Sequence, residues 1–275
     1  MPHLPTEPSS PETYPVQPER LPVEAIREDR YEVDFARTRE ELDAILELRF
    51  RIFNLELGEG LVESYQTERD EDRFDAVCQH LLVRDLSPEE PVIVGSYRIQ
   101  TNEMAATHRG FYSADEFDLS GLPEDFITQA AEVGRACVAR AHRSTQVLFL
   151  LWKGLAAYMT HNRKRYLFGC SSITSQDPAA GEAMRAYLEA GGFVHPEFAA
   201  PPLPPSQCRW AGEAVAPATK HDVPPLFRIY LRHGGKVAPH PAIDREFKTI
   251  DFLTFFDTEA MPKRMFQLFF GSRRR

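Results

Sequence analysis

One part of the chain constrains the fold more than any other, because it alternates strand-like and helix-like segments with almost nothing between them. The segment AEVGRACVA (131–139) has the small and β-branched residues of a buried strand. The apolar segment VLFLLWKGLAAYMTHN (147–162) follows it directly and has the length of a helix, and RYLFGCSSI (165–173) is again strand-like. This alternation is typical of proteins in which helices cover the faces of a sheet.

The remaining segments extend the same pattern in both directions. Thr38 and Glu41 form a capping box, which predicts the start of a helix. The other elements that we expect are a strand at 31–37, a helix at 41–57, a hairpin of 79–85 and 91–101, a short helix within 108–127, a helix at 178–192, a strand at 249–257 and an amphipathic helix at 259–270. This order predicts an α/β fold with a mixed β-sheet flanked by helices on both faces.

Composition divides the chain into two parts. Residues 1–29 contain seven of the 22 prolines and almost no large apolar residue before Leu21, so we expect a disordered or loosely attached arm. Residues 30–275 are expected to form one domain, with a C-terminal extension from about residue 196, where a proline-rich loop occurs.

Composition also excludes several classes of protein. The formal net charge of −9 argues against a nucleic-acid partner, and the chain has no apolar run of about eighteen residues that would span a bilayer. The cysteines are widely spaced and form no CxxC pair, so we expect neither a disulfide framework nor a metal site, and a reducing cytoplasmic environment. They are Cys78, Cys137, Cys170 and Cys208.

Charged residues in the strand 131–139 are the strongest sign of function. Burying an unpaired charge costs free energy, so we expect Glu132 either to have a hydrogen-bond or ion-pair partner or to have a functional role. One interpretation is structural, with Glu132 paired to Arg98 or Arg135. A shared site is the alternative, but residues 132 and 135 point to opposite faces of a regular strand. They can meet only if a bulge intervenes, which Gly134 permits.

An anion site is predicted where this strand leads into the next helix. The first N–H groups of a helix lack partners within it and attract anions. Arg140, Arg143 and Ser144 lie at that point, ready for a phosphate or pantetheine arm.

Two other features do not indicate catalysis. His80 and Asp85 match the H-x4-D pattern of glycerolipid O-acyltransferases, but in a strand they face opposite sides and lie ~16 Å apart. We interpret the match as chance, unless this segment is a loop at the start of a helix. Cys137 is expected to be a small core residue rather than a nucleophile.

Five motifs in a fixed order resemble the ornithine-lipid biosynthesis N-acyltransferases. They are LRFRIFNLELG (48–58), DRFDAVCQHLLVRD (72–85), VGSYRI (94–99), EVGRACV (132–138) and LWKGLAAYM (151–159). The segment 224–257 also resembles the tail of that family, and the likeness covers residues 31–270. The family lies in the GNAT (N-acetyltransferase) superfamily and is related to the acyl-homoserine-lactone synthases.

The resemblance implies a GNAT-type fold and a reaction. An acyl or 3-hydroxyacyl group would pass from the phosphopantetheine thioester of acyl carrier protein, the co-substrate, to the α-amine of ornithine or a similar amino acid, with no bound cofactor. The product would be a lyso-aminolipid. Two alternatives remain open, a lactone-forming signal synthase and a non-catalytic module that binds an acyl chain or carrier protein. The tail from residue 220 favours the lipid enzymes.

The resemblance also implies roles for individual residues. Glu132 corresponds to the carboxylate taken as general base and Arg135 to its charged neighbour. The implied acceptor-side residues are Arg49, Phe53, Asp72, Asp75 and Arg98. Alternatively, Asp72 and Asp75 are a capping pair on a solvated loop, and Arg98 only pairs with Asp75 or Glu132.

The donor side is expected at the end of the same strand. Backbone N–H groups from Gly134 to Ala136 could stabilise an oxyanion. Arg140, Arg143, Ser144 and Lys153 are the expected docking rim for the acidic carrier protein.

The terminal helix is amphipathic and ends near Arg273–Arg275, which suits contact with an anionic inner membrane. The alternative is that Phe266, Phe269 and Phe270 pack on the core.

Overall fold

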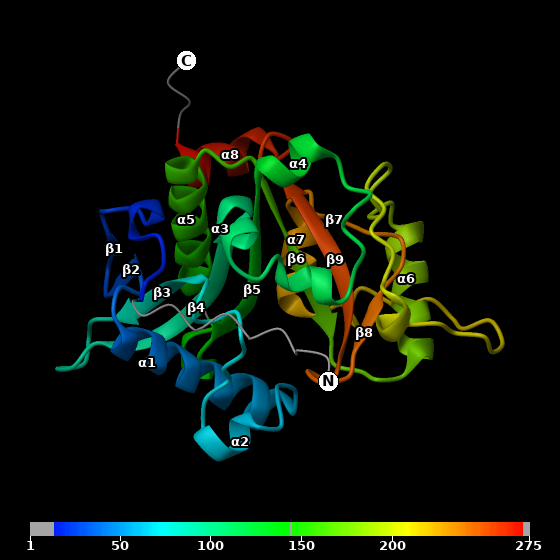
Figure 1. Cartoon of the computed structure of the whole chain (residues 1–275), viewed down its shortest axis with the longest axis horizontal. Helices are drawn as coiled ribbons and strands as arrows, with labels where there is room; N and C mark the ends of the chain where they lie inside the picture. The colour runs from blue at the N-terminus through cyan, green and yellow to red at the C-terminus, as the bar shows by residue number, and fades with distance from the viewer. Residues whose placement is uncertain (1–13, 144, 272–275) are drawn as a thin grey trace, which may run out of the picture.

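The computed structural model describes residues 14–143 and 145–271 and contains a nine-stranded mixed sheet (Figure 1). The strands follow the order β1-β2-β3-β4-β5-β6-β9-β7, and β8 also pairs with β9. Their bounds are β1 (Ile26–Glu28), β2 (Tyr31–Phe35), β3 (Gln79–Asp85), β4 (Val92–Thr101), β5 (Ala130–Val138), β6 (Tyr166–Ile173), β7 (Lys236–Val237), β8 (Ala242–Asp244) and β9 (Thr249–Asp257). Only β5 and β6 pair in parallel, because a helix connects them across the sheet.

Helices cover both faces of this sheet, which confirms the predicted fold class (Figure 1). They are α1 (Arg39–Phe50), α2 (Ser64–Thr67), α3 (Asn102–Thr107), α4 (Glu124–Thr128), α5 (Thr145–Asn162), α6 (Pro178–Ala190), α7 (Pro225–Arg232) and α8 (Lys263–Phe270). Short turns are η1 (Pro18–Arg20), η3 (Tyr112–Asp115), η4 (Arg140–His142) and η5 (Pro204–Ser206). Cys137 of β5 packs with the α1 side, whereas Ala136 and Val138 pack with α5, α7 and α8.

The predicted first helix is present but changes type along its length. Thr38 accepts a hydrogen bond from the Glu41 N–H (3.3 Å), and the Thr38 N–H donates to the Glu41 carboxylate (3.3 Å), as the capping box requires. After Phe50 the helix continues as a π-helical segment, η2 (Arg51–Leu57), which ends at Gly58 with a φ of 70°. Such wide turns often occur at functional sites.

Ordered structure begins well before residue 30, contrary to the expectation of a loosely attached arm. β1 pairs with β2, and Val16 and Leu21 are only 6% and 2% exposed. The Gln79 amide donates hydrogen bonds to the carbonyls of Val16 (3.0 Å) and Gln17 (2.9 Å). A few buried apolar residues and hydrogen bonds from the Gln79 side chain are enough to hold residues 14–29 on the domain. Residues 1–13 lie outside the described part.

Strands β5 and β6 separate halfway along their length. They pair only from Ala130 to Glu132, against Tyr166 to Phe168. At the point of separation a Cβ on Gly169 would lie 2.0 Å from the Val133 carbonyl oxygen. Only glycine allows this approach of the two backbones.

A β-bulge lies on the other side of β5. Ser96 pairs with Cys137 and Arg98 with Gly134, so that Arg135 and Ala136 both stand opposite Tyr97. Arg135 has a φ of 50°, and the extra residue reverses the alternation of side chains beyond it. The bulge that the sequence analysis required between residues 132 and 135 is therefore present, and Glu132 and Arg135 lie on one face of the sheet.

The terminal helix α8 turns its aromatic side toward the domain. The ring of Phe269 lies 5.4 Å from that of Phe149 and 5.5 Å from that of Trp152, while Lys263 and Arg264 are exposed. This is the packing that the alternative interpretation expected. Arg273–Arg275 lie outside the described residues, and no helix within the described residues is long and apolar enough to cross a membrane.

Candidate active site

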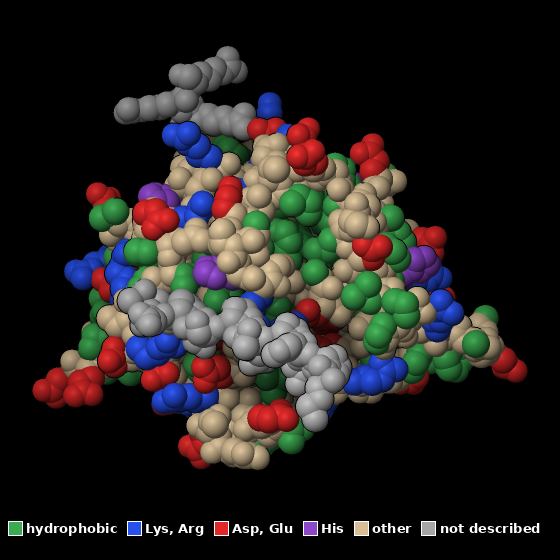
Figure 2. All heavy atoms as spheres, in the orientation of Figure 1, with side chains coloured by type: hydrophobic (Ala, Val, Ile, Leu, Met, Phe, Trp, Pro, Cys, Tyr) green, Lys and Arg blue, Asp and Glu red, His purple; other side chains and the backbone are tan. Residues whose placement is uncertain are grey.

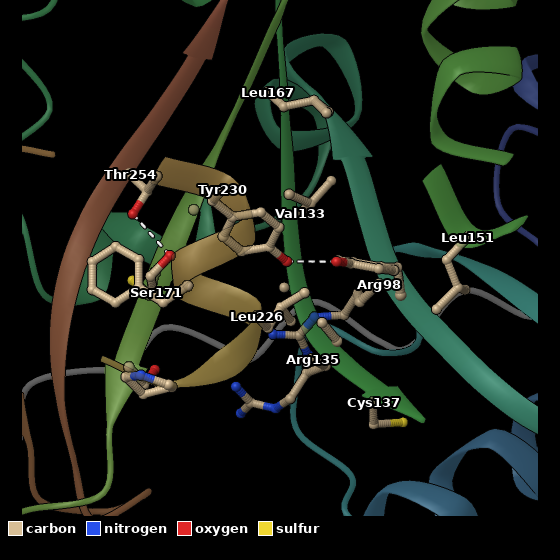
Figure 3. A pocket seen from close by; sticks show the side chains of 18 of the residues that line it. Arg98, Val133, Arg135, Cys137, Leu151, Leu167, Ser171, Leu226, Tyr230 and Thr254 are labelled. Carbon is tan, nitrogen blue, oxygen red and sulfur yellow. Dashed lines mark hydrogen bonds between the residues drawn. The ribbon is translucent and has the colours of Figure 1, made fainter. Parts of the chain in front are cut away.

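A cavity of about 810 Å³ opens where β5 separates from β6. One wall is apolar and comes mainly from α5 and α7: Leu148, Leu151, Trp152, Leu155, Leu226, Ile229 and Tyr230. The opposite wall is polar and includes Arg98, Glu132, Arg135, Ser113 and Asp251. Figure 3 shows Tyr230 and Leu226 on α7 on one side of this space, with Arg98 and Arg135 extending toward it from β4 and β5. A single cavity thus joins an apolar compartment to a charged one.

Behind the polar wall lies a buried network of ion pairs, made of Arg49, Arg98, Arg135, Asp70, Asp72 and Asp75. Arg49 has no exposed surface and donates to Asp70 (2.7 Å) and Asp75 (2.6 Å). Arg98 donates to Asp72 (2.6 Å) and Asp75 (3.1 Å). The network joins α1, the loop before β3, β4 and β5, so it sets where β5 lies relative to α1.

Two acids of the network, Asp72 and Asp75, have lowered pKa values in spite of their burial. Burial alone would raise the pKa of Asp75, but Arg49 and Arg98 outweigh it and hold that pKa well below its usual range. Asp72 behaves in the same way, since Arg98 and Arg135 lower its pKa against burial and against Asp75. Buried charges survive only when they are paired in this way.

The structure combines the two interpretations of Asp72 and Asp75. Asp72 accepts a hydrogen bond from the Phe74 N–H (2.8 Å), and Asp75 accepts one from the Asp72 N–H (2.8 Å), as a capping pair does. However, Asp75 is fully buried and both acids bind Arg98. The loop is therefore not solvated, and the pairing of Arg98 with Asp75 is real, whereas the Arg98–Glu132 pair is absent among the described residues.

Arg135 points from the bulge into the cavity. Its Nη2 donates to Asp72 (3.0 Å), and its guanidinium lies over the rings of Phe247 (4.2 Å) and Tyr112 (4.9 Å). Its Nε faces Asp70 Oδ2 at 3.5 Å, and its Nη1 has no hydrogen-bond partner among the described residues. Phe53 supports this wall, with its ring 5.4 Å from that of Phe247. Arg135 thus keeps donors available for a ligand.

Glu132 is bound by neutral donors and not by the arginines that the structural interpretation proposed. Its carboxylate accepts hydrogen bonds from Gln100 Nε2 (2.7 Å), the Tyr112 N–H (2.7 Å), the Ser113 N–H (2.7 Å) and Ser113 Oγ (2.6 Å). Four donors fill the acceptor positions of a carboxylate. Of these four donors, Ser113 Oγ is the one that can also accept a proton.

The donor-side residues are only partly brought together. Gly134 and Ala136 line the cavity at the bulge. Arg143 lies at its mouth, where it donates to the Val138 carbonyl (3.1 Å) and to Glu56 (2.8 Å), and the exposed Arg140 precedes it in η4. These two arginines therefore lie near the cavity, and their role as a docking rim stays a prediction.

Lys153 does not belong to that rim. It forms a salt bridge with Glu28 of β1 (2.5 Å) and does not line the cavity. The reason is helical periodicity, which turns residue 153 of α5 toward β1. Ser144 lies outside the described residues.

The two features set aside on sequence are also explained. His80 bonds to Asp75 (3.2 Å) and Asp85 bonds to Arg30 (3.0 Å), both from the regular strand β3, so the H-x4-D match is chance. Burial raises the pKa of the Cys137 thiol to about 12, as expected for a core residue.

Sequence reasoning missed several residues of the site, namely Asp70, Gln100, Tyr112, Ser113, Phe247, Glu116 and Asp251. Only Asp70 had a signal, because it lies in the charged run 68–75. The polar atoms of Glu116, Cys170 and Asp251 lie within 4.8 Å of one another, so this group could hold a cation. Gln100 comes from β4, Tyr112 and Ser113 from η3, and Asp251 from β9, whereas Glu116 and Phe247 lie in connecting segments, and none of them belongs to a local pattern.

Comparisons with known proteins place the chain in a family. A model of the acetyltransferase (GNAT) domain matches residues 48–153. The L-ornithine N(alpha)-acyltransferase of Brucella abortus is 34% identical over 246 residues, which cover 85% of this chain and 86% of that protein. The protein of the same name from Agrobacterium fabrum is 32% identical over 258 residues, covering 89% and 86%.

Solved structures show a more distant likeness. The AHL synthase LasI has a TM-score of 0.47 at 12% identity and covers 89% of this chain and 98% of its own. FeeM, an N-acyl amino acid synthase from uncultured soil microbes, has a TM-score of 0.46 at 10% identity, with 84% and 92% covered. Because the curated relatives match at more than 30% identity over most of both chains, this chain belongs to the L-ornithine N(alpha)-acyltransferase family.

Proposed function

We propose that this protein transfers an acyl group from the thioester of acyl carrier protein to the α-amine of ornithine or a closely similar amino acid. The observation that carries the proposal is the cavity at the separation of β5 and β6, where an apolar wall meets a charged wall. An acyl chain suits the first wall and an amino acid suits the second. The names of the relatives supply the choice of ornithine.

The acceptor would be held by Arg135. Its unused guanidinium donors match the α-carboxylate of an amino acid, and the rings of Tyr112 and Phe247 fix the plane of the group. The α-amine then lies toward the bulge, where the thioester carbonyl would bind. The backbone N–H groups of Gly134 to Ala136 could receive the oxyanion that forms on attack.

The α-ammonium of the acceptor must lose a proton before it can attack. Ser113 lines the cavity and donates to Glu132 (2.6 Å). In the proposed step Ser113 Oγ takes a proton from the ammonium while its own proton passes to Glu132, so that the amine becomes neutral and the serine is unchanged. Glu132 is thus the general base, acting through a hydroxyl group.

Replacing Ser113 by alanine tests this relay. The two backbone N–H groups and Gln100 still hold Glu132, so the melting temperature should stay close to that of the wild type. We expect kcat at pH 7 to fall by about 10²-fold. The loss should shrink as pH rises, because free amine becomes available without a base. Wild-type kcat at pH 7 in the variant would exclude the relay.

The carrier protein would dock at η4. Arg140 is exposed and has no salt bridge among the described residues, whereas Arg143 is already paired with Glu56. Replacing Arg140 by glutamate should raise the KM for acyl carrier protein by about 3–10-fold and leave the KM for the amino acid unchanged. The difference should disappear at 0.5 M salt, which screens surface charges. If the wild type and the Arg140→Glu variant had the same KM for acyl carrier protein at low salt, the docking surface would lie elsewhere.

The reaction itself is tested with purified protein, an acyl carrier protein loaded with a C16 chain, and ornithine. Mass spectrometry should detect Nα-acylornithine, and acyl-coenzyme A at the same concentration should react more slowly. Absence of acylated amino acid with either donor would reject the proposed function. Lipid extracts from cells that express the wild type or Glu132→Ala provide the same comparison in vivo.

A further inference from the structure

A pair of buried acids lies at the polar wall, away from the ion-pair network, with Asp251 facing the cavity and Glu116 beside it but not lining the cavity. Asp251 of β9 lines the cavity and is 3% exposed, and Glu116, just after η3, is 5% exposed. Within the described part of the chain, no N–H or hydroxyl group donates to either carboxylate oxygen of Glu116 or to Oδ1 of Asp251, and the two carboxyl groups lie within hydrogen-bonding reach of each other. Neither residue forms a salt bridge there, although every acid of the network has an arginine. This wall therefore contains buried acids without a cation.

The electrostatics of the pair follow from its geometry. Burial and then the neighbouring acid, Asp251, raise the pKa of Glu116 well above its usual range. Burial likewise raises the pKa of Asp251. Two carboxyl groups so close together cannot both ionise unless a positive charge joins them, and they share a proton otherwise. A ligand that brings a cation would relieve this repulsion.

The acids lie within reach of the proposed reaction centre. Cys170 Sγ is 3.9 Å from Ser113 Oγ, and the same sulfur lies within 4.8 Å of the polar atoms of Glu116 and Asp251. The α- and δ-nitrogens of a five-carbon diamino acid are ~6 Å apart when the chain is extended, given bonds of about 1.5 Å. One such molecule can therefore place its α-amine at Ser113 and its second nitrogen at the acids.

We propose that Asp251 and Glu116 bind the side-chain ammonium of a diamino-acid acceptor and so select it over neutral amino acids of the same length. The inference rests on the proposed function and extends it to the residues that choose the acceptor. An ammonium group has three donors and a full charge, so it can replace the proton that the two carboxyl groups otherwise share. Glu59, a buried acid that bonds to Thr174 on the same wall, adds to the negative potential.

A metal ion is the competing occupant, because Cys170 completes a group of three possible ligands. A thiol must lose its proton to bind a metal. Burial raises the pKa of Cys170 well above its usual range, with Glu116 and Asp251 adding to the effect, so a metal would have to displace this proton, whereas an ammonium group would not. The chemistry of the site therefore favours an ammonium group over a metal.

The test compares ornithine with norvaline (2-aminopentanoic acid), which has the same carbon chain without the ammonium. Wild-type protein should use ornithine with a kcat/KM about 10–100-fold higher than that for norvaline, as expected for hydrogen bonds to a charged group. Asp251→Asn and, separately, Glu116→Gln should remove most of this preference by lowering kcat/KM for ornithine. Activity with norvaline should change by less than about 3-fold in both. Glu246→Gln is the matched control, because Glu246 is exposed in the turn that leads to β9.

Each outcome decides the inference. Equal use of both amino acids by the wild type, or an unchanged preference in both variants, would overturn it, and the wild-type comparison needs no variant to fold. If EDTA abolishes the activity and Zn²⁺ restores it, with thermal stabilisation by Zn²⁺ lost in both variants, the pair is a metal site and the inference is wrong. If the wild type acylates neither amino acid, the proposed function itself fails, which is a different result from loss of preference.

Discussion

Replacing Asp75 by asparagine should destabilise the protein by about 3–5 kcal/mol, the usual cost of breaking a buried ion pair. Asp75 accepts hydrogen bonds from Arg49 (2.6 Å), Arg98 (3.1 Å) and the Asp72 N–H (2.8 Å), with no exposed surface. An asparagine amide would place an NH₂ group against the arginine donors. It would also remove the negative charge that Asp75 supplies to the buried guanidinium groups of Arg49 and Arg98. Urea unfolding followed by circular dichroism measures the change.

The matched control for this variant is Asp115→Asn. Asp115 also pairs with an arginine, Arg73, but both side chains are about half exposed. A surface pair of this kind adds little, so the control should unfold at nearly the wild-type urea concentration. If Asp75→Asn also unfolded at nearly the wild-type urea concentration, the ion-pair network would not stabilise the packing of β5 on α1.

The same network predicts how stability depends on pH. Arg49 and Arg98, acting against burial, hold the pKa of Asp75 well below its ordinary value of 3.8 in the folded protein. Near and below pH ~4 the unfolded chain therefore binds more protons than the folded chain, so stability is present above that pH and is lost as pH falls. The free energy of unfolding of the wild type should decrease from pH ~5 to pH ~3, and Asp75→Asn should show a smaller slope.

Replacing Gly169 by alanine should cost about 3 kcal/mol or more, from overpacking and backbone strain together. The added Cβ would lie 2.0 Å from the Val133 carbonyl oxygen, and the φ of 154° at this residue is one that side chains rarely adopt. Backbone cannot move aside as a flexible side chain can. The two strands would separate earlier, so we also expect loss of activity.

Gly134 is the natural control, since it lies one residue along β5 from Val133. A Cβ at Gly134 meets no atom within 4 Å, and its φ is not positive. Thermal unfolding should place Gly134→Ala close to the wild type and Gly169→Ala far below it. If Gly134→Ala is stable but has a higher KM for the acyl donor, the donor passes over this glycine, as the sequence predicted. Equal stability of the two alanine variants would refute the close approach at Gly169.

Elements with a strong local pattern were predicted well. The capping box at Thr38, the hairpin of β3 and β4 and the order β5–α5–β6 all depend on residues near one another in the chain. Even the requirement for a bulge followed from the alternation of side chains. The arm was predicted poorly, because burial of Val16 and Leu21 depends on surfaces that other segments supply.

The site divides in the same way. Arg49, Asp72, Asp75, Arg98 and Arg135 were chosen through the family resemblance, and the structure joins them in one network. The structural interpretation, in which Glu132 pairs with Arg98 or Arg135, was wrong. The partners of Glu132 are Gln100 of β4 and the backbone N–H groups of Tyr112 and Ser113 at the start of η3. Every residue except proline has a backbone N–H group, so the sequence does not indicate which of them will bind a carboxylate.

By itself, then, the sequence determined the class of fold, the place of β5 and its charges at the centre of the site, and the family. These depend on periodicity and on motifs, which are local. Only the tertiary structure decided that Ser113 donates to Glu132, that Lys153 turns away to Glu28, and that Asp251 lies beside Glu116. Those outcomes depend on contacts between segments far apart in the chain, where a shift of a few ångströms decides whether two groups bond.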